Sequence, residues 1–421
     1  MRKFILSFLM VAVIGSCAYH DVEDIATSKT SSNRISVEEA KRNVIKFVSS
    51  INRQNATRGA VPHTLEIASV LPVTSVVTPK TRSQAGTAAV EDTLFYVVKF
   101  AGENSGFALA ASTKKSVPVY AYVEEGEYTD FVANNGTATN PGFEGFLGAL
   151  YEYTTQGDDP HEVDSSRFDE NGNVKYDETI VLKTPLLVTK WGQGAPYNLK
   201  CEGNLAGCVP VALAQIWTHL GRLANVSWTD GLNSGGSQLD WGAIRSMSQA
   251  YPGKSLNVIS NVNENDTVRQ IASLIRFMGC NSNASYGKDG TGADSEYAIK
   301  EVKKMGVNVD GLRDFDDFAV VNHLRSNLIV FMRGDGRYYH VGLVFRKYVD
   351  GHAWVVDGFL DRYEAGNRYI YLHCNWGWNG DQNGYFYSKI LNTEEKRYED
   401  DGKKTRTNFR YNLKTAAIWN G

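Results

Sequence analysis

A cysteine at the start of an apolar helical stretch is the residue of this sequence best suited to covalent chemistry. Cys208 follows Gly207 at the point where a loop gives way to that stretch, which we expect to run to about residue 220. A thiol at a helix N-terminus lies against the positive end of the helix dipole, which favours the thiolate. Because the thiolate is the nucleophilic form, Cys208 is a candidate for attack on a carbonyl carbon.

A cysteine nucleophile needs an imidazole that takes up its proton and later returns it. The chain has eight histidines, and two of them, His340 and His352, open strand-like runs in its C-terminal half. His352 follows a turn, so its ring could project from the end of a strand into a cleft. His340 could be an ordinary sheet histidine, although the residues alone leave both candidates open.

Two further segments carry side chains that could assist such a pair. Asn375 could hydrogen-bond the imidazole and fix its tautomer, while Trp376 could shield that bond from water. A packed turn at a sheet edge would explain residues 375–378 equally well. The amide of Gln193 has two N–H donors, which could stabilise an oxyanion together with the backbone N–H of Cys208. A solvated turn residue is the alternative for Gln193.

Helices precede strands in the part of the chain that must position these residues. Helical patterns cover residues 208–220, 268–278 and 295–305. The strand-like runs that follow are residues 328–332, 340–345, 353–356, 369–372 and 384–387. We expect residues 184–421 to form one domain, in which Cys208 opens a helix.

The N-terminal half of the sequence predicts a smaller α+β unit over residues 35–155. Ser36 starts a capping-box pattern ahead of an amphipathic helix. Strand-like runs at residues 93–100 and 107–111 predict a hairpin. Residues 156–183 are acidic and rich in turn formers, which indicates an exposed linker that proteases can reach.

Four motifs of the chain resemble the streptopain family of bacterial cysteine peptidases. They are residues 190–194, 207–215, 351–358 and 375–378, in the order Gln, Cys, His and Asn-Trp that papain-like peptidases share. The resemblance implies an α+β fold. It would be a papain-like cysteine peptidase fold, with a helical part and an antiparallel sheet, preceded by a small α+β prodomain.

The resemblance implies roles for the thiol and the imidazole. Cys208 would be the nucleophile, and the motif at residues 351–358 makes His352, rather than His340, the acid–base. Pro210 departs from the family pattern, in which a small residue is more usual at this point. A proline in the first helical turn is nevertheless tolerated, because its missing N–H would have no partner there.

The other candidates take their roles from the same resemblance. Asn375 would orient the imidazole and Trp376 would cover that contact. Gln193 and the backbone N–H of Cys208 would bind the oxyanion. Protein or peptide substrates are implied, and no metal or organic cofactor is implied.

The implied activity is that of a cysteine endopeptidase made as an inactive precursor and activated by proteolytic removal of its prodomain. Residues 35–155 would be the prodomain, acting as an intramolecular inhibitor. Residues 156–183 would be the activation linker and residues 184–421 the catalytic domain. A Cys-His amidase or a transglutaminase-like acyl transferase is an alternative enzyme, and a catalytically silent binding protein on a peptidase scaffold is an alternative of another class.

Residues 1–17 have the pattern of an export signal: a basic start, a short apolar run and small residues before Cys17. The apolar run is too short to span a bilayer. The pattern resembles a bacterial lipoprotein signal, in which Cys17 would carry the lipid anchor and residues 18–34 would form a tether. The alternative is an ordinary signal peptide that is cleaved near Ser16, in which case Cys17 would have no special role. We expect an exported protein of the cell envelope or extracellular space, specifically an outer-membrane lipoprotein that touches the membrane only through this anchor.

The net charge and the remaining cysteines limit the other functions that the chain could have. The formal net charge of −3 gives no reason to expect a nucleic-acid partner. Cys201, Cys280 and Cys374 are interpreted as packing residues, with a disulfide among them left open because export permits one. Residues 169–173 resemble a calcium loop only faintly, since they lack its full oxygen spacing.

Overall fold

A long helix packed against antiparallel strands forms the N-terminal part of the protein. Its elements are α1 (Val37–Ala56), β1 (Ile67–Val77), β2 (Val90–Phe100), β3 (Phe107–Ala111), β4 (Val119–Val123) and α2 (Pro141–Thr155). The hydroxyl of Ser36 accepts the backbone N–H of Glu39 (3.2 Å), so the predicted capping box does begin α1. The predicted hairpin is β2 with β3.

The C-terminal part starts with a strand, continues with helices and ends in strands. Its first elements are β5 (Thr179–Lys183), α3 (Cys208–Leu220), α4 (Trp241–Ala250), α5 (Asp266–Cys280), α6 (Ser295–Lys304), β6 (Val307–Val309), β7 (Arg313–Asp314) and α7 (Asp317–Arg325). The later ones are β8 (Ile329–Asp335), β9 (Arg337–Val341), β10 (Phe345–Val349), β11 (His352–Glu364), β12 (Asn367–Asn375), β13 (Gly384–Tyr387), α8 (Ser388–Leu391) and β14 (Tyr411–Asn420).

This computed structural model describes most of the chain beyond its N-terminal segment. The described residues are 33–56, 65–77, 90–128, 140–155, 179–221, 239–250, 265–287, 290–341, 345–349, 351–364, 367–391 and 411–421. Residues 34–421 group into one unit by their contacts. The predicted lipidation site at Cys17 and most of the predicted linker lie outside the described residues.

One antiparallel sheet runs through both parts of the chain. Its strand order is β1-β2-β3-β4-β13-β12-β11-β8-β14-β6, with β5 paired to β11 and β7 to β14. The junction is the pairing of β4 with β13, where Ala121 lies opposite Phe386. The last residues of the predicted linker form β5, so that stretch joins the sheet instead of remaining a loop.

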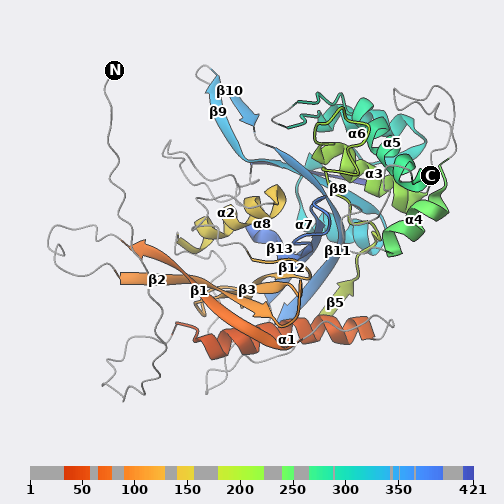
Figure 1. Cartoon of the computed structure of the whole chain (residues 1–421). Helices are drawn as coiled ribbons and strands as arrows, with labels where there is room; N and C mark the ends of the chain where they lie inside the picture. The colour runs from red at the N-terminus through yellow and green to blue at the C-terminus, as the bar shows by residue number, and fades with distance from the viewer. Residues whose placement is uncertain are drawn as a thin grey trace, which may run out of the picture. The chain divides into compact units, whose positions relative to one another are not determined.

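The two faces of the sheet pack against different helices. Alternation along β11 places Trp354 and Val356 in a core with α1, α2, α7 and α8, and Ala353 and Val355 in a second core with α3, α5 and α6. Figure 1 shows α3 to α6 gathered on one side of β8 and β11, with α2 and α8 on the other. Residues near the start of β11 therefore lie between the Cys208 helix and α2.

Two sequence-based expectations differ from the structure in detail. The strand expected at residues 340–345 is divided between β9 and β10, which pair with each other as a separate two-stranded sheet. Cys201, Cys208, Cys280 and Cys374, the cysteines within the described residues, are all free thiols, and Cys280 is exposed instead of packed in the interior as expected. No helix in the described segments combines the length and the hydropathy needed to cross a bilayer.

Candidate active site

Cys208 is the first residue of α3, as the sequence predicts. The residue before it, Gly207, caps the helix with a φ of 91°, a backbone conformation that side chains disfavour. A Cβ atom at this position would also lie 2.9 Å from Cγ2 of Thr291. The glycine therefore permits both the turn and the close approach that set the thiol at the helix N-terminus.

The environment of Cys208 holds the thiol protonated but contains donors for a thiolate. The residue keeps some solvent exposure, yet burial of the sulfur raises the pKa of Cys208 above its ordinary value. Backbone N–H groups of Ala353, Val209 and Cys208 itself favour the thiolate and oppose this rise, as does the charge of Arg333. Ala353 directly follows His352, so this contact brings the thiol to the start of β11.

His352 is buried at the start of β11, and burial lowers the pKa of its imidazole to about 4. A hydrogen bond between Nε2 and the backbone carbonyl of Trp376 (3.0 Å) partly opposes this shift. Because a carbonyl can only accept, Nε2 carries the hydrogen and Nδ1 is the basic nitrogen of the neutral ring. The ring stacks on Trp354, with centroids 5.9 Å apart.

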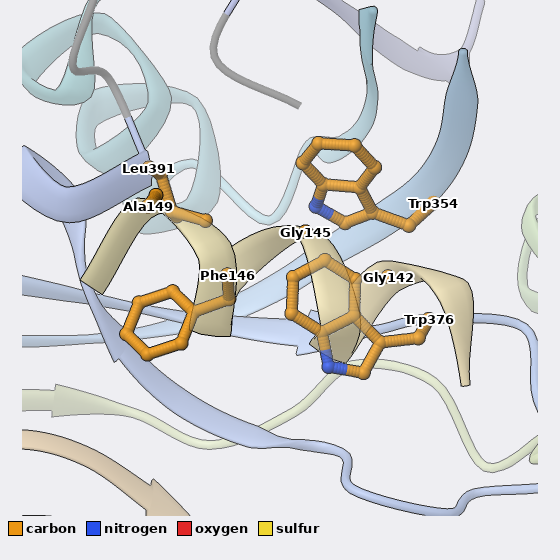
Figure 2. A pocket seen from close by; sticks show the side chains of 7 residues that line it. All are labelled: Gly142, Gly145, Phe146, Ala149, Trp354, Trp376 and Leu391. Atoms are coloured by element: carbon orange, nitrogen blue, oxygen red, sulfur yellow. The ribbon is translucent and has the colours of Figure 1, made fainter. Parts of the chain in front are cut away.

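The N-terminal part of the chain covers this histidine through α2. A Cβ atom at Gly142 would lie 2.7 Å from Cδ2 of Trp376 and 3.1 Å from Nε2 of His352, so only a glycine allows α2 this close. Figure 2 shows the small apolar pocket between α2 and the two indoles, lined by Gly142, Gly145, Phe146, Ala149, Trp354, Trp376 and Leu391.

Asn140 anchors the start of α2 at this position. Its Oδ1 accepts the backbone N–H of Gly142 (3.0 Å), and its Nδ2 donates to the carbonyl of Asp381 (2.7 Å). The residue is fully buried. The helix that covers His352 is thus tied by a side-chain amide to the turn that follows Trp376.

Asn375 is the last residue of β12, and both the nitrogen and the oxygen of its side-chain amide form hydrogen bonds. Nδ2 donates to the carbonyl of Thr189 (2.8 Å), and Oδ1 accepts the backbone N–H of Gly377 (3.2 Å). The remaining partner is the amide of Gln215, on α3. In this arrangement the carbonyl of Trp376, the next residue, holds the imidazole, so the predicted role of Asn375 in orienting His352 stays a prediction.

Backbone hydrogen bonds bring the Gln193 segment to the Cys208 helix. The carbonyl of Gln193 accepts the N–H of Ala206 (2.8 Å), two residues before Cys208. The carbonyl of Trp191 accepts the N–H of Asn379 (3.1 Å), which follows the Asn-Trp motif. These bonds join the segment that carries Gln193 to the start of the Cys208 helix and to the turn after the Asn-Trp motif.

Trp376 is packed and hydrogen-bonded. Its indole N–H donates to the carbonyl of Gln382 (3.0 Å), and its ring contacts Trp354 and Phe386 with centroids 5.2 and 5.0 Å away. The indole therefore lies beside the His352 contact and under α2, where it can exclude water.

Sequence reasoning did not single out two buried polar groups beside the site. Gln215 lies on α3 and is fully buried. His373 lies outside the four motifs, yet its Nδ1 lies 2.6 Å from Oδ1 of Asp357 and its Nε2 lies 3.4 Å from Oε2 of Glu124. A polar residue on an otherwise apolar helix was the signal for Gln215. No local signal marked the pairing of His373 with a carboxylate as distant as Glu124.

The other histidine candidate, His340, lies in β9, and its backbone pairs with Arg346 of β10. This strand pair is separate from the sheet that carries His352. The register of β11 thus places His352, and not His340, in the strand beside the thiol.

Comparison with known proteins identifies relatives of this chain. Residues 191–386 match the model of the peptidase C10 family. The chain is 24% identical over 369 residues to streptopain of Streptococcus pyogenes, an alignment that covers 73% of this chain and 81% of that protein. It is also 24% identical over 321 residues to the thiol protease/hemagglutinin PrtT of Porphyromonas gingivalis, covering 72% of this chain and 34% of that one.

The chain also aligns with a solved structure. A fragment of prointerpain A from Prevotella intermedia aligns with a TM-score of 0.48 and 19% identity, over 78% of this chain and 96% of the fragment. The region that matches the family model spans the motifs of Gln193, Cys208, His352 and Asn375. Together with the curated relatives, it supports the assignment of a peptidase activity. Residues 191–386 of the chain thus match the peptidase C10 family, and the chain is a cysteine endopeptidase.

Proposed function

We propose that Cys208 and His352 are the nucleophile and the acid–base of this endopeptidase. Nδ1 of His352 takes the thiol proton, and the sulfur bonds to the carbonyl carbon of the peptide as the carbonyl electron pair moves to oxygen. The imidazolium then gives its proton to the leaving nitrogen as the C–N bond breaks. Water hydrolyses the thioester in the same way, and releases the thiol and the acid.

The remaining site residues support these steps. Gln193 and the backbone N–H of Cys208 donate to the oxyanion, a contribution of about 3 kcal/mol for one such donor. Asn375, by fixing the turn whose Trp376 carbonyl binds Nε2, helps to keep the imidazole in the tautomer with a basic Nδ1, and the Trp376 indole keeps water from that contact. Protein or peptide substrates enter after α2 has moved away from His352.

The chain is made as a precursor in which residues 35–155 form an inhibitory prodomain. Two observations support this: α2 lies against His352 and Trp376, and both reacting groups are held neutral by burial. A thiolate–imidazolium pair needs a more polar setting than this one. Cutting within residues 156–183 releases the prodomain and opens the catalytic domain, residues 184–421.

We also propose that the protein is exported and anchored to the outer membrane. The signal pattern of residues 1–17 supports export, lipidation of Cys17 and attachment to the outer membrane through the tether at residues 18–34. Cells grown with a labelled fatty acid should incorporate label into the wild-type chain and not into the Cys17→Ser variant. Label on both chains, or on neither, would contradict the anchor.

The observation that carries the proposed function is the thiol at the N-terminus of α3 beside the backbone of Ala353, one residue from His352. Residues 18–421 should be purified with a reductant and followed for self-shortening and for cleavage of casein. We expect both activities in the wild-type chain and in Cys280→Ser, whose thiol is exposed at the end of α5. Neither should occur in Cys208→Ala, and equal activity in Cys208→Ala would refute the assignment.

A further inference from the structure

A buried pair of side-chain amides links the Cys208 helix to the Asn375 turn. Gln215 and Asn375 are 0% and 2% exposed. Nε2 of Gln215 donates to Oδ1 of Asn375 (3.3 Å), and Nδ2 of Asn375 donates to Oε1 of Gln215 (3.3 Å). Oε1 of Gln215 also accepts the backbone N–H of Trp191 (3.1 Å).

We propose that Gln215 is a positioning residue of the peptidase reaction, which sets the orientation and the place of the Asn375 amide relative to Cys208. The inference rests on the proposed function, in which Asn375 orients His352. Gln215 would touch neither the substrate nor the thiol, and would act only through Asn375 and the Gln193 segment.

Backbone groups of fixed polarity determine which way both amides point. The Trp191 N–H can only donate, so it requires Oε1 of Gln215 on its side. The Thr189 carbonyl can only accept, so it requires Nδ2 of Asn375. The N–H of Gly377 then faces Oδ1 of Asn375. Each amide thus stays in one orientation, and the oxygen of Asn375 always lies toward the Gly377 turn.

The same pair braces three segments that carry candidate catalytic residues. Gln215 lies two helical turns after Cys208 on α3, and its oxygen binds the segment that leads to Gln193. Its amide N–H group binds the residue at the end of β12. A shift of any one segment would break a hydrogen bond that no water could replace in a site so fully buried.

Loss of this brace should reduce the chemical step more than substrate binding, because misplacement of catalytic groups by about 1 Å can cost about 100-fold in rate. The first test is Gln215→Met, which keeps the volume and removes the amide. The matched control is Thr218→Val, on the same helix, where a buried hydroxyl donates to the carbonyl of Ala214 (2.9 Å). Variants that do not mature alone are cut by a trace of active wild-type enzyme.

We expect Gln215→Met to lower kcat about 10- to 100-fold with KM changed less than threefold. Thr218→Val should keep the kcat of the wild type, even if its unfolding midpoint falls as much as that of Gln215→Met. The inference is overturned if kcat is unchanged in Gln215→Met, or if both variants lose kcat in proportion to their loss of stability.

A conservative variant keeps the test decisive if Gln215→Met does not fold. In Gln215→Glu, a protonated carboxyl group can donate to Oδ1 of Asn375, whereas a carboxylate would repel it. Burial raises the pKa of such a group, so the ratio of kcat in this variant to kcat in the wild type should increase as the pH falls from 7 to 5. A ratio that does not change with pH would count against positioning.

A double-mutant cycle separates this inference from the proposed function. If Gln215 acts through Asn375, the losses of kcat in Gln215→Met and Asn375→Ala should not multiply in the double variant. Multiplying losses would refute the inference and leave the Cys208 assignment intact. Activity in Cys208→Ala would instead refute the proposed function.

Discussion

At the scale of single residues, burial and neighbouring charges together set the charge of three groups near the site. Burial raises the pKa of Cys208 and lowers the pKa of His352 to about 4, so both members of the proposed catalytic pair are neutral at pH 7. His373 is also buried, but the carboxylates of Asp357 and Glu124 outweigh burial and raise its pKa to about 10. The same sheet thus holds one imidazole neutral and another charged, according to the neighbours of each ring.

This charge on His373 predicts a pH-dependent contribution to the stability of the precursor. Because its pKa is raised in the folded state, the contribution is fully present below pH 6.5 and is lost as the pH rises through about 10. In a Cys208→Ala background, which keeps the chain uncut, His373→Gln should lower the free energy of unfolding in urea by about 3 kcal/mol at pH 6. The difference should shrink toward pH 10.

The control for that experiment is His323→Gln. His323 lies 3.5 Å from Asp310 in a pair that is partly exposed, and its removal should cost less than about 1 kcal/mol at either pH. A charged His373 would be contradicted if the loss of unfolding free energy in His373→Gln grows with pH. It would also be contradicted if that loss is as small as the loss in His323→Gln.

At the scale of elements, the contact of α2 with the two indoles is the proposed restraint on His352. Gly142→Ala places a methyl group within van der Waals overlap of Trp376, and overpacking of this kind costs about 1–3 kcal/mol. We expect the Gly142→Ala precursor to mature faster than the wild type, followed by gel analysis of the full-length band. Gly292→Ala is the matched control, because a Cβ atom at Gly292 meets nothing within 4 Å. Equal maturation rates in the three chains would show that α2 does not restrain the site.

At the scale of the whole molecule, the precursor and the mature enzyme should differ at one strand edge. β4 pairs with β13, so release of the proposed prodomain, residues 35–155, would leave β13 with an unpaired edge. We expect peptides covering residues 384–387 to exchange amide hydrogens faster in the mature enzyme than in the Cys208→Ala precursor. Peptides covering β8, which lies between β11 and β14, should exchange equally in both. Unchanged exchange at β13 would mean that the prodomain stays bound after cutting.

Local patterns predict the elements of this fold better than they predict its long-range pairings. The cysteine helix, the hairpin and the helix from Ser295 follow from capping and periodicity, and the structure contains all three. The pairing of β4 with β13 joins residues more than 250 positions apart, so no local pattern could reveal it. For the same reason the sequence gives no hint that Gln215 meets Asn375, or that a glycine of α2 rests on Trp376.

The most direct test of the account is to map where an alkylating reagent stops the enzyme. Mature enzyme is treated with less than one equivalent of iodoacetamide at pH 6, and the loss of activity is compared with the labelled cysteines found by mass spectrometry. We expect label on Cys208 in proportion to the activity lost, and slower labelling of the same thiol in the uncut precursor, where burial raises its pKa. Full labelling of Cys208 with activity retained, or inactivation that follows label on the exposed Cys280, would contradict the account.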